Sequence, residues 1–311
     1  MKAAQYKTYG GPEVIEINDA PEPTVGKEQI LVRVYAAGVN PFDWKLRTGY
    51  MKDMVELKFP VTMGGDFSGV VVKAGENITD FKIGDEVYGQ ALILNGGSGS
   101  IAEFAVANVK NTARKPQNIN HIESASLPLV GSSALQALEQ HIGLKSGQKI
   151  LINGGSGGIG SLAIQLAKSI GAYVATTVST EHVEFAKKLG TDVAVDYKNE
   201  NVIDKIKGFD AVFDTAGGQS RDNAVKVLKR GGIIVSMNGV PDQKLLEEYG
   251  VRGIGQSTSV SRDKLIRLAE LAEQGIVKPQ VDKVFPLEQT REAFIYQEIS
   301  HPKGKVVISV K

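Results

Sequence analysis

The sequence predicts an α/β protein, in which a doubly wound parallel sheet accompanies a smaller β-rich domain. Three observations support this fold class. The apolar run 150–153 leads into the glycine-rich stretch 154–160, which opens a segment with helical periodicity. From about residue 122 onward, apolar strands alternate with helical segments. The first 120 residues instead contain short strands separated by Gly, Pro and Asp.

The β-rich part of the chain comes first. Its expected strands lie at 29–37, 67–75, 82–89 (a turn and then a strand) and 103–106. Short strands with frequent turn residues predict a compact barrel-like or sandwich domain.

The alternating part follows. We expect a helix at 131–142, after Pro128, and then strands at 150–153, 173–178, 192–195, 210–214 and 232–237. Helices are expected between them, at 182–189 and 221–229 among others, and an amphipathic helix at 262–274. This alternation predicts a parallel sheet covered on both faces. The last strand, 305–310, has no helix after it, so we expect it to pair back into the first domain.

The glycine-rich stretch carries the strongest single motif. Gly155, Gly157 and Gly160 fit G-x-G-x-x-G, with a strand before and a helix after, as the Rossmann dinucleotide turn requires. There the first glycine makes the tight turn, the second lets the backbone approach the pyrophosphate, and the third lets helix and strand pack closely. The expected cofactor contacts are Gly155, Ser156, Gly157, Gly158, Ile159 and Gly160.

Composition excludes several function classes. The chain has 311 residues, a formal net charge of +1 and no cysteine, which rules out disulfides, a thiol nucleophile and thiolate zinc sites. No apolar run approaches the roughly 20 residues of a membrane span, and the start lacks a signal-type apolar core. We therefore expect a cytoplasmic protein with neither membrane nor nucleic-acid partners.

Several blocks along the chain resemble one family. They are Ala-Gly-Val-Asn-Pro-Phe-Asp at 37–43, Met-Gly-Gly-Asp-Phe-Ser-Gly at 63–69, Gly-Asp-Glu-Val-Tyr-Gly at 84–89, Ala-Ser-Leu-Pro at 125–128 and Gly-Lys-Val-Val at 304–307. Together the chain resembles a zinc-free member of the medium-chain dehydrogenase/reductase superfamily, in its quinone oxidoreductase branch. The resemblance implies a GroES-like catalytic domain from 1–121 and 277–311, a Rossmann NADP(H)-binding domain at 122–276, and an active cleft between them.

The resemblance also bears on metal and catalytic residues. Zinc-containing relatives carry a cysteine near Asn40 and a histidine where Gly65 stands, so no metal site is expected here. Asn40 and Tyr50 match positions that line the cleft and are the catalytic candidates. Asn40 would bond a substrate oxygen or the nicotinamide ribose, or would serve only as a turn residue before Pro41. Tyr50 would offer a phenol or a stacking face.

Two carboxylates near these positions receive structural roles. We expect Asp43 to act as a local cap. Asp66 replaces a glutamate that lies near the metal in relatives, and we expect it to pair with Lys45 or Arg47.

Cofactor choice is read at the end of the second Rossmann strand. An NAD protein places Asp or Glu there, whereas this chain has a hydroxyl-rich turn with no carboxylate before Glu181, so NADPH is expected. Ser179 and Thr180 also suit helix N-capping, and both roles can coexist. The remaining cofactor contacts assigned are Ser179, Thr180, His182, Tyr197 and Gly239, with Lys198 beside them.

The resulting hypothesis is an NADPH-dependent oxidoreductase that reduces quinones by metal-free hydride transfer. The alternative is an enoyl or alkenal (activated alkene) reductase, which shares the same parts. The non-enzyme alternative is a nucleic-acid-binding or crystallin-like relative, and the near-zero net charge argues against nucleic acid. We also expect a homodimer, because 253–258 would form an exposed edge strand that a second copy could pair.

Overall fold

The computed structural model describes residues 1–311, which divide into two compact units. Unit 1 comprises Met1–Leu129, Val260–Gly275 and Pro279–Lys311, and unit 2 comprises Val130–Ser259 with Ile276–Lys278. Both chain ends thus build unit 1. These boundaries differ from those expected: 122–129 and the amphipathic helix near 262–274 group with unit 1.

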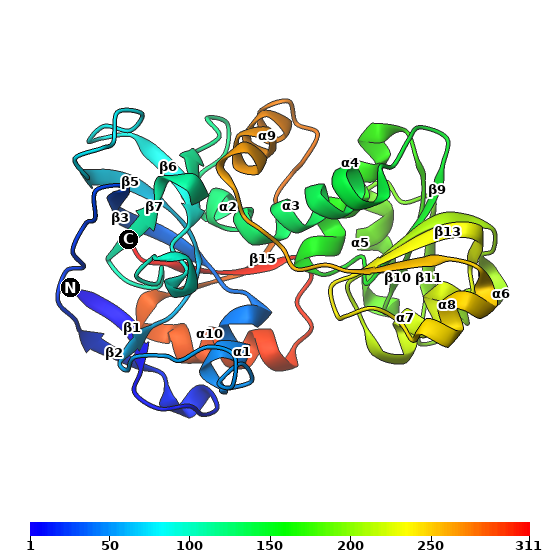
Figure 1. Ribbon diagram of the computed structural model, residues 1–311, viewed down its shortest axis with the longest axis horizontal. Helices are drawn as coiled ribbons and strands as arrows, with labels where there is room; N and C mark the ends of the chain where they lie inside the picture. Colours follow the sequence, from blue (N-terminus) through cyan, green and yellow to red (C-terminus); the bar gives the residue numbers. More distant parts are fainter. The chain divides into compact units, whose positions relative to one another are not determined.

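Unit 1 is mainly β (Figure 1). Its strands are β1 (Lys2–Tyr6), β2 (Glu16–Asp19), β3 (Gln29–Gly38), β4 (Val61–Thr62), β5 (Asp66–Ala74), β6 (Glu86–Gln90), β7 (Phe104–Asn108), β8 (Thr112–Arg114), β15 (Val281–Pro286) and β16 (Lys305–Ser309). Its helices are α1 (Pro41–Arg47), α2 (His121–Ala125), α9 (Arg262–Glu273) and α10 (Thr290–Ile299).

The larger sheet of unit 1 has the order β15-β16-β3-β5-β6-β8, and β7 pairs with the first half of β3. The expected return of the last strand is confirmed, because β16 runs antiparallel to the end of β3 with Val307 opposite Gly38. A smaller sheet joins β2, β1 and β4. Alternate residues of β3, such as Ile30 and Val32, pack into one buried core with Phe67.

Unit 2 is the α/β part. Its strands are β9 (Lys149–Asn153), β10 (Tyr173–Val178), β11 (Val193–Asp196), β12 (Phe209–Asp214), β13 (Leu228–Ser236) and β14 (Arg252–Gly255). Its helices are α3 (Pro128–Leu135, which begins in the last residues of unit 1), α4 (Gly158–Ile170), α5 (Val183–Lys188), α6 (Val202–Lys205), α7 (Gly218–Val225) and α8 (Gln243–Tyr249).

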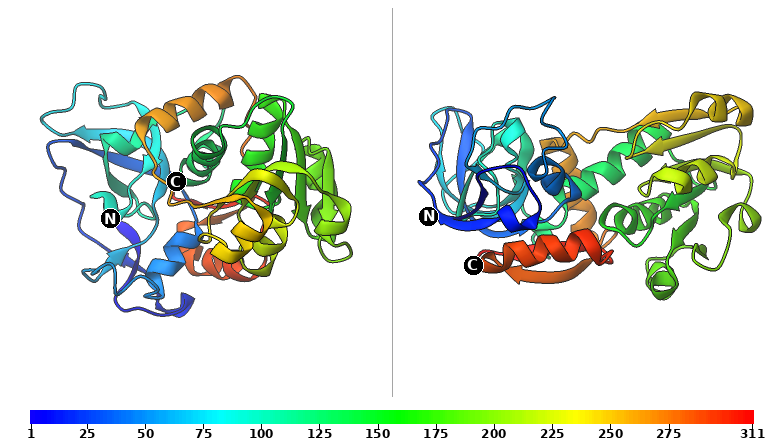
Figure 2. Two further views of the ribbon diagram at one scale, coloured as in Figure 1. Left: turned by 45° about the vertical axis from the view of Figure 1, so that its right-hand side comes forward. Right: turned by 90° about the horizontal axis from the view of Figure 1, so that it is seen from below.

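The sheet of unit 2 is parallel throughout, in the order β11-β10-β9-β12-β13-β14. The connection after β9 leads to β10 on one side of the sheet, and the connection after β12 leads to β13 on the other side. Because both crossovers are right-handed, their helices lie on opposite faces of the sheet. Helices α6, α7 and α8 lie together on one of them (Figures 1 and 2), over a core that includes Leu151, Val212 and Ile234. The expected edge strand at 253–258 is confirmed in part, since β14 pairs only with β13 but ends at Gly255.

Two expected helices have different bounds. The helix expected at 221–229 is α7, which ends at Val225, because Leu228 already belongs to β13 and pairs with Phe209. The helix expected at 131–142 starts at Pro128, whose fixed φ suits the first helical position, and continues as a π-helical segment over Gln136–Ile142. No helix is both long and apolar enough to cross a membrane.

Candidate functional site

The glycine turn between β9 and α4 needs glycine at three positions for its own geometry. Gly154 has φ +89°, the left-handed region that favours glycine, although it lies just outside the motif recognised in the sequence. A Cβ on Gly155 would collide with Thr176 Oγ1, and one on Gly160 would collide with the Gly154 carbonyl. These glycines are therefore required by the packing of strand, turn and helix.

Gly157 is different. Its φ is −73°, which any residue adopts, and the nearest atom to a Cβ built on it is the Gly154 carbonyl oxygen at 3.8 Å. The fold itself thus does not require glycine here, and the space beside the backbone is open. This fits a position where the backbone approaches a dinucleotide pyrophosphate.

The N-terminus of α4 supplies the donors for such an anion. The bond from the Ser161 N–H to the Gly157 carbonyl, 2.9 Å long, belongs to its first turn. The amides of Gly158, Ile159 and Gly160 precede it and point out of the helix end, where the helix dipole also favours negative charge. Helix α4 has 13 residues, which makes this a full-length helix terminus. The turn as a whole therefore fits a phosphate group.

The second part of the predicted site follows β10. Ser179 precedes a 3-10 turn over Thr180–His182, and its Oγ lies 3.3 Å from His182 Nδ1. The Ser179 side chain makes no capping bond to that turn. Thr180 Oγ1 accepts a bond from Asn199 Nδ2 at 3.1 Å. The structure thus brings the expected hydroxyls of Ser179 and Thr180 to one edge of the sheet.

An ion pair at this edge was not foreseen. Lys198 Nζ lies 3.1 Å from both carboxylate oxygens of Glu181, and the neighbouring Tyr197 is exposed. A bond from its own backbone N–H and the Lys198 ammonium lower the pKa of Glu181 to about 2. Glu181 is therefore ionised at neutral pH, and it forms an ion pair with Lys198.

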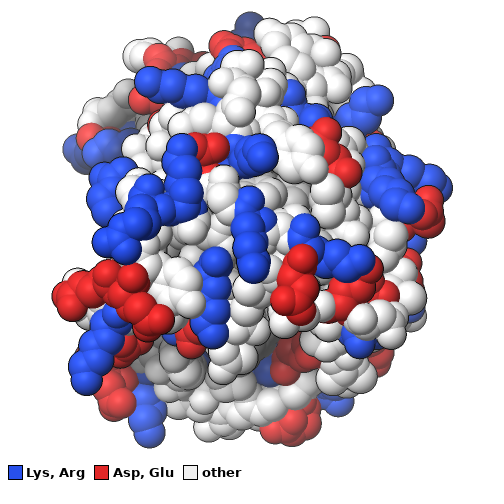
Figure 3. Space-filling model, turned by 90° about the vertical axis from the view of Figure 1, so that its right-hand side faces the viewer, with Lys and Arg blue, Asp and Glu red and all other residues white.

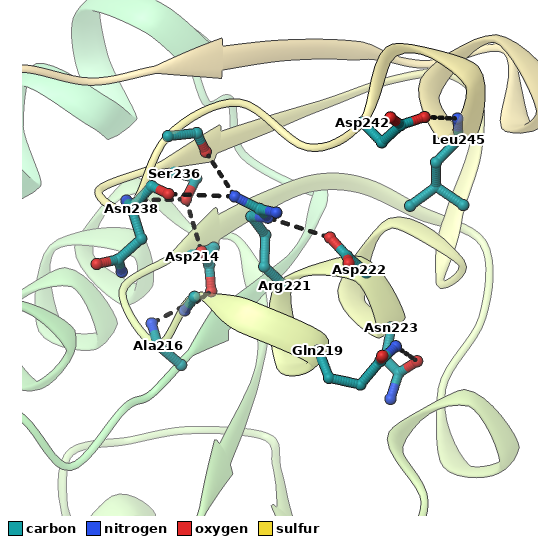
Figure 4. A network of polar contacts seen from close by, with 12 residues as sticks. Asp214, Ala216, Gln219, Arg221, Asp222, Asn223, Ser236, Asn238, Asp242 and Leu245 are labelled. Carbon is teal, nitrogen blue, oxygen red and sulfur yellow. Dashed lines mark hydrogen bonds and ion pairs between the residues drawn. The ribbon is translucent and has the colours of Figure 1, made fainter.

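The loop after β13 carries Gly239, which has φ +86°. Arg221 Nη1 donates to the carbonyls of Asn238 (3.1 Å) and Gly239 (3.3 Å), as Figure 4 shows for Asn238. Asn238 Nδ2 in turn donates to the Thr215 carbonyl at 3.2 Å. The loop is thus held against the turn that follows β12.

A set of buried polar side chains at the carboxyl ends of the strands was missed in the sequence. Asn153 ends β9, Thr177 lies near the end of β10, Asp214 ends β12 and Ser236 ends β13, and all four are buried. The available signal was a polar residue at the end of each apolar run. Carboxyl ends of parallel strands meet at one edge, where ligands bind in such sheets.

In unit 1, the two catalytic candidates have opposite surroundings. Asn40 is 1% exposed, and both ends of its amide are engaged: Nδ2 donates to Asp66 Oδ2 at 2.9 Å, and Oδ1 accepts from Lys305 Nζ at 2.5 Å. Tyr50 is 78% exposed, and its phenol makes no hydrogen bond within the chain. Of the two, only Tyr50 presents a free polar group.

The expected pairing of Asp66 with Lys45 or Arg47 is wrong. Asp66 is fully buried and accepts from Asn40, from Gln90 Nε2 (3.3 Å) and from the Leu129 N–H (3.1 Å). Arg47 instead pairs with Glu298 at 3.0 Å and bonds the Gly10 carbonyl. The cation near Asp66 is Lys305, from the far end of the chain, which also donates to the Val39 carbonyl.

The expected local capping by Asp43 is confirmed. Its Oδ2 accepts the Asn40 N–H at 2.8 Å at the start of α1. Burial raises the pKa of Asp43 to about 7, and the nearby Asp66 carboxylate adds to this. Burial also raises the pKa of Asp66 and lowers the pKa of Lys305. Asn40, Asp43, Asp66 and Lys305 are hereafter called the buried quartet.

Within the buried quartet, Asp43 should make stability depend on pH. Below about pH 3 the carboxyl is protonated whether the chain is folded or unfolded, but as pH rises from there toward 7 only the unfolded chain ionises freely, so stability declines across this window. We expect Asp43→Asn to remove this decline, worth about 4 kcal/mol between pH 4 and pH 8. Urea denaturation of both proteins across that range measures it. Parallel stability profiles would contradict the assignment.

No group of metal-ligating side chains forms a further site. The structure contains no group of three or more His, Asp or Glu side chains that could hold a metal ion. The face of the molecule in Figure 3 carries both basic and acidic side chains, in keeping with the net charge of +1.

The chain is similar to known proteins over nearly its whole length. Residues 26–117 match the alcohol dehydrogenase GroES-like domain, and residues 189–308 match the zinc-binding dehydrogenase model. The chain is 39% identical to the chloroplastic NADPH-dependent alkenal/one oxidoreductase of Arabidopsis thaliana, over 99% of this chain and 79% of that protein. It is 33% identical to the chloroplast envelope quinone oxidoreductase homolog of the same plant, over 99% and 98%.

A solved structure agrees with these relatives. The quinone oxidoreductase from Coxiella burnetii is 33% identical and superposes with a TM-score of 0.90, covering 100% of this chain and 99% of that one.

Proposed function

The chain belongs to the medium-chain dehydrogenase/reductase superfamily, among its zinc-free quinone and alkenal oxidoreductases, and from this premise we propose that it is an NADPH-dependent reductase of activated alkenes and quinones. The open space at Gly157 beside the α4 N-terminus is the observation that carries the proposal, because it fits a dinucleotide. The relative at 39% identity is named an alkenal/one oxidoreductase, and the relative at 33% identity is named a quinone oxidoreductase homolog. We therefore place conjugated carbonyl compounds first and quinones second.

Different residues of unit 2 would bind different parts of the cofactor. The amides at the start of α4 would bind the pyrophosphate, which passes over Gly157. Ser179, Thr180 and His182 would face the 2′-phosphate, and the loop with Gly239 would face the nicotinamide end. When bound, NADPH supplies a hydride, and conjugation in the acceptor spreads the negative charge that develops. Such acceptors need less help from a Lewis acid than an alcohol does.

Tyr50 is the better placed of the two catalytic candidates. Its phenol is exposed and unbonded, so it can donate a proton to the reduced acceptor or stack against it. Asn40 would have to give up a bond to Asp66 or Lys305 before it could bind a ligand. We therefore assign Asn40 a structural role, through its bonds to Asp66 and Lys305, and we assign Tyr50 the contact with substrate.

The proposal is tested by following the loss of reduced-nicotinamide absorbance as NADPH is oxidised with small alkenals, enones and quinones. We expect turnover with conjugated acceptors, none with the saturated aldehydes, and no loss in the presence of a chelator. Turnover of saturated carbonyls alone would refute the substrate class. Removal of bound zinc by the chelator, with loss of activity, would refute the metal-free chemistry.

NADPH is expected to be preferred over NADH, because no carboxylate precedes Glu181 at the end of β10. Ser179→Asp should lower kcat/KM for NADPH by at least about 10-fold, equivalent to 1.4 kcal/mol, with a smaller change for NADH, since a carboxylate repels the 2′-phosphate. Glu181→Gln is the matched control: it releases Lys198 and should improve NADPH affinity. Equal effects on both cofactors would place the 2′-phosphate elsewhere.

The homodimer stays a prediction, supported by the open edge of β14. Light scattering at micromolar concentration should give twice the 33.3 kDa chain mass. A monomer mass would contradict it, and Ile254→Lys, on β14, should weaken the dimer. The cytoplasmic location also stays a prediction, because the relatives named above are chloroplast proteins.

A further inference from the structure

We propose that Asp214 and Asn153 are positioning residues for the dinucleotide, because they set the direction of a chain of buried hydrogen bonds that ends on both sides of its site. The inference rests on the cofactor part of the proposed function and not on which acceptor is reduced.

The chain of bonds can be followed from Asp214 toward the glycine turn. Asn153 Nδ2 donates to Asp214 Oδ1 at 2.7 Å, and Thr177 Oγ1 donates to Asn153 Oδ1 at 2.6 Å. The Gly154 N–H then donates to Thr177 Oγ1 at 3.0 Å. The chain thus ends on the left-handed glycine that starts the phosphate-binding turn.

A second branch runs the other way along the sheet edge (Figure 4). Ser236 Oγ donates to Asp214 Oδ2 at 2.7 Å and accepts the Asn238 N–H at 3.1 Å. This branch ends on the residue before Gly239. The turn after β12 joins the same carboxylate, since Asp214 Oδ1 also accepts the N–H groups of Ala216 (3.2 Å) and Gly217 (3.1 Å).

The carboxylate sets the direction of every bond because it can only accept. Asn153 must therefore present its NH₂ group to Asp214 and its oxygen to Thr177. The Thr177 hydroxyl must donate to that oxygen, which leaves a lone pair for the Gly154 N–H. On the other branch, the Ser236 hydroxyl must donate to Asp214 and so accepts from Asn238. Both branches end on a backbone N–H whose position is thereby defined.

The position of this network in the sheet connects it to the cofactor. Asn153 and Asp214 lie opposite each other at the carboxyl ends of β9 and β12. These two strands are where the strand order reverses, with β10 and β11 on one side and β13 and β14 on the other. Dinucleotides bind in the crevice above such a switch point. The bond between Asn153 and Asp214 therefore spans the strands beneath the expected crevice.

Exchanging the two residues tests the directional argument. The double variant Asn153→Asp/Asp214→Asn keeps composition, charge and volume. However, the atom at the Oδ1 position on β12 must still accept the Ala216 and Gly217 N–H groups, so it must be the oxygen of the new amide. An amide oxygen cannot donate to the carboxylate introduced on β9, so the bond between the two strands is lost. We expect the NADPH Kd, measured by fluorescence titration, to rise at least about 10-fold in this variant and in Asn153→Asp alone. The KM for NADPH should rise more than kcat falls.

Two further variants keep the test decisive. Asp214→Asn alone retains the acceptor at Oδ1 and disturbs only the Ser236 branch, so it should stay folded and raise Kd by about 3-fold. Ser220→Ala removes a side bond to Asn153 (3.1 Å) that lies off the chain, and should leave Kd unchanged. Wild-type Kd in the exchanged variant, or lower melting temperatures with unchanged Kd throughout, would overturn the inference. A wild type that binds NADPH but reduces no acceptor would refute the substrate class alone.

Discussion

Replacing Gly157 with valine is expected to raise the Kd for NADPH at least about 100-fold, or 2.7 kcal/mol, while the protein stays folded. The reason lies in what surrounds the residue. A Cβ at this position meets no protein atom closer than 3.8 Å, and the backbone conformation suits any residue. The branched side chain would instead occupy the space assigned to the pyrophosphate. Fluorescence titration gives the affinity, and thermal unfolding of the free protein gives the stability.

The neighbouring glycines provide the matched control. Gly160→Val should destabilise the free protein, because its side chain would collide with the Gly154 carbonyl. The two variants thus separate a glycine that the ligand needs from one that the fold needs. Wild-type affinity in a folded Gly157→Val protein would show that the dinucleotide binds elsewhere.

Lys305→Met is expected to lower the free energy of unfolding by about 3–5 kcal/mol, a large share of the 5–15 kcal/mol typical of a domain. The ammonium is buried, bonds Asn40 Oδ1 and the Val39 carbonyl, and is the cation beside Asp66 and Asp43. Methionine fills the space but leaves those acceptors without a donor and the carboxylates without a counter-charge. Urea denaturation at neutral pH measures the loss.

Two variants test whether charge is the cause. Lys303→Met, at an exposed lysine two positions earlier, should be nearly neutral. Lys305→Met/Asp66→Asn should be more stable than Lys305→Met alone, because the uncompensated carboxylate is removed. Additive losses in the double variant would show that Lys305 acts through packing instead.

Local patterns predicted much of this structure. Strands β3, β5, β10 and β12 were expected within about a residue or two, since apolar runs bounded by turn residues are local signals. The glycine turn was recognised because its strand and helix are adjacent in sequence. The return of β16 to unit 1 was also foreseen, from a strand that had no helix after it.

Contacts between distant residues could not be predicted in the same way. Lys305 and Asn40 are 265 positions apart, so the partner of Asp66 was sought among nearby bases and wrongly assigned. Gly154 lies outside the motif pattern, although its backbone makes the left-handed turn. Helix α9 is amphipathic, but periodicity shows only that a helix has an apolar face and not which unit that face packs on.

The use of both chain ends in unit 1 has a consequence for biosynthesis. The ribosome releases the chain from the N-terminus, so unit 2 is nearly complete while β3 still lacks the strand that pairs with residues 36–38. Until residues 305–309 emerge, the nascent unit 1 has an open sheet edge at β3, and Asp43 and Asp66 lack the neighbouring Lys305. Most domains tolerate trimming at the C-terminus. Here, a premature stop codon just before Lys305 should leave a product that chaperones retain and proteases degrade, even though it lacks none of unit 2.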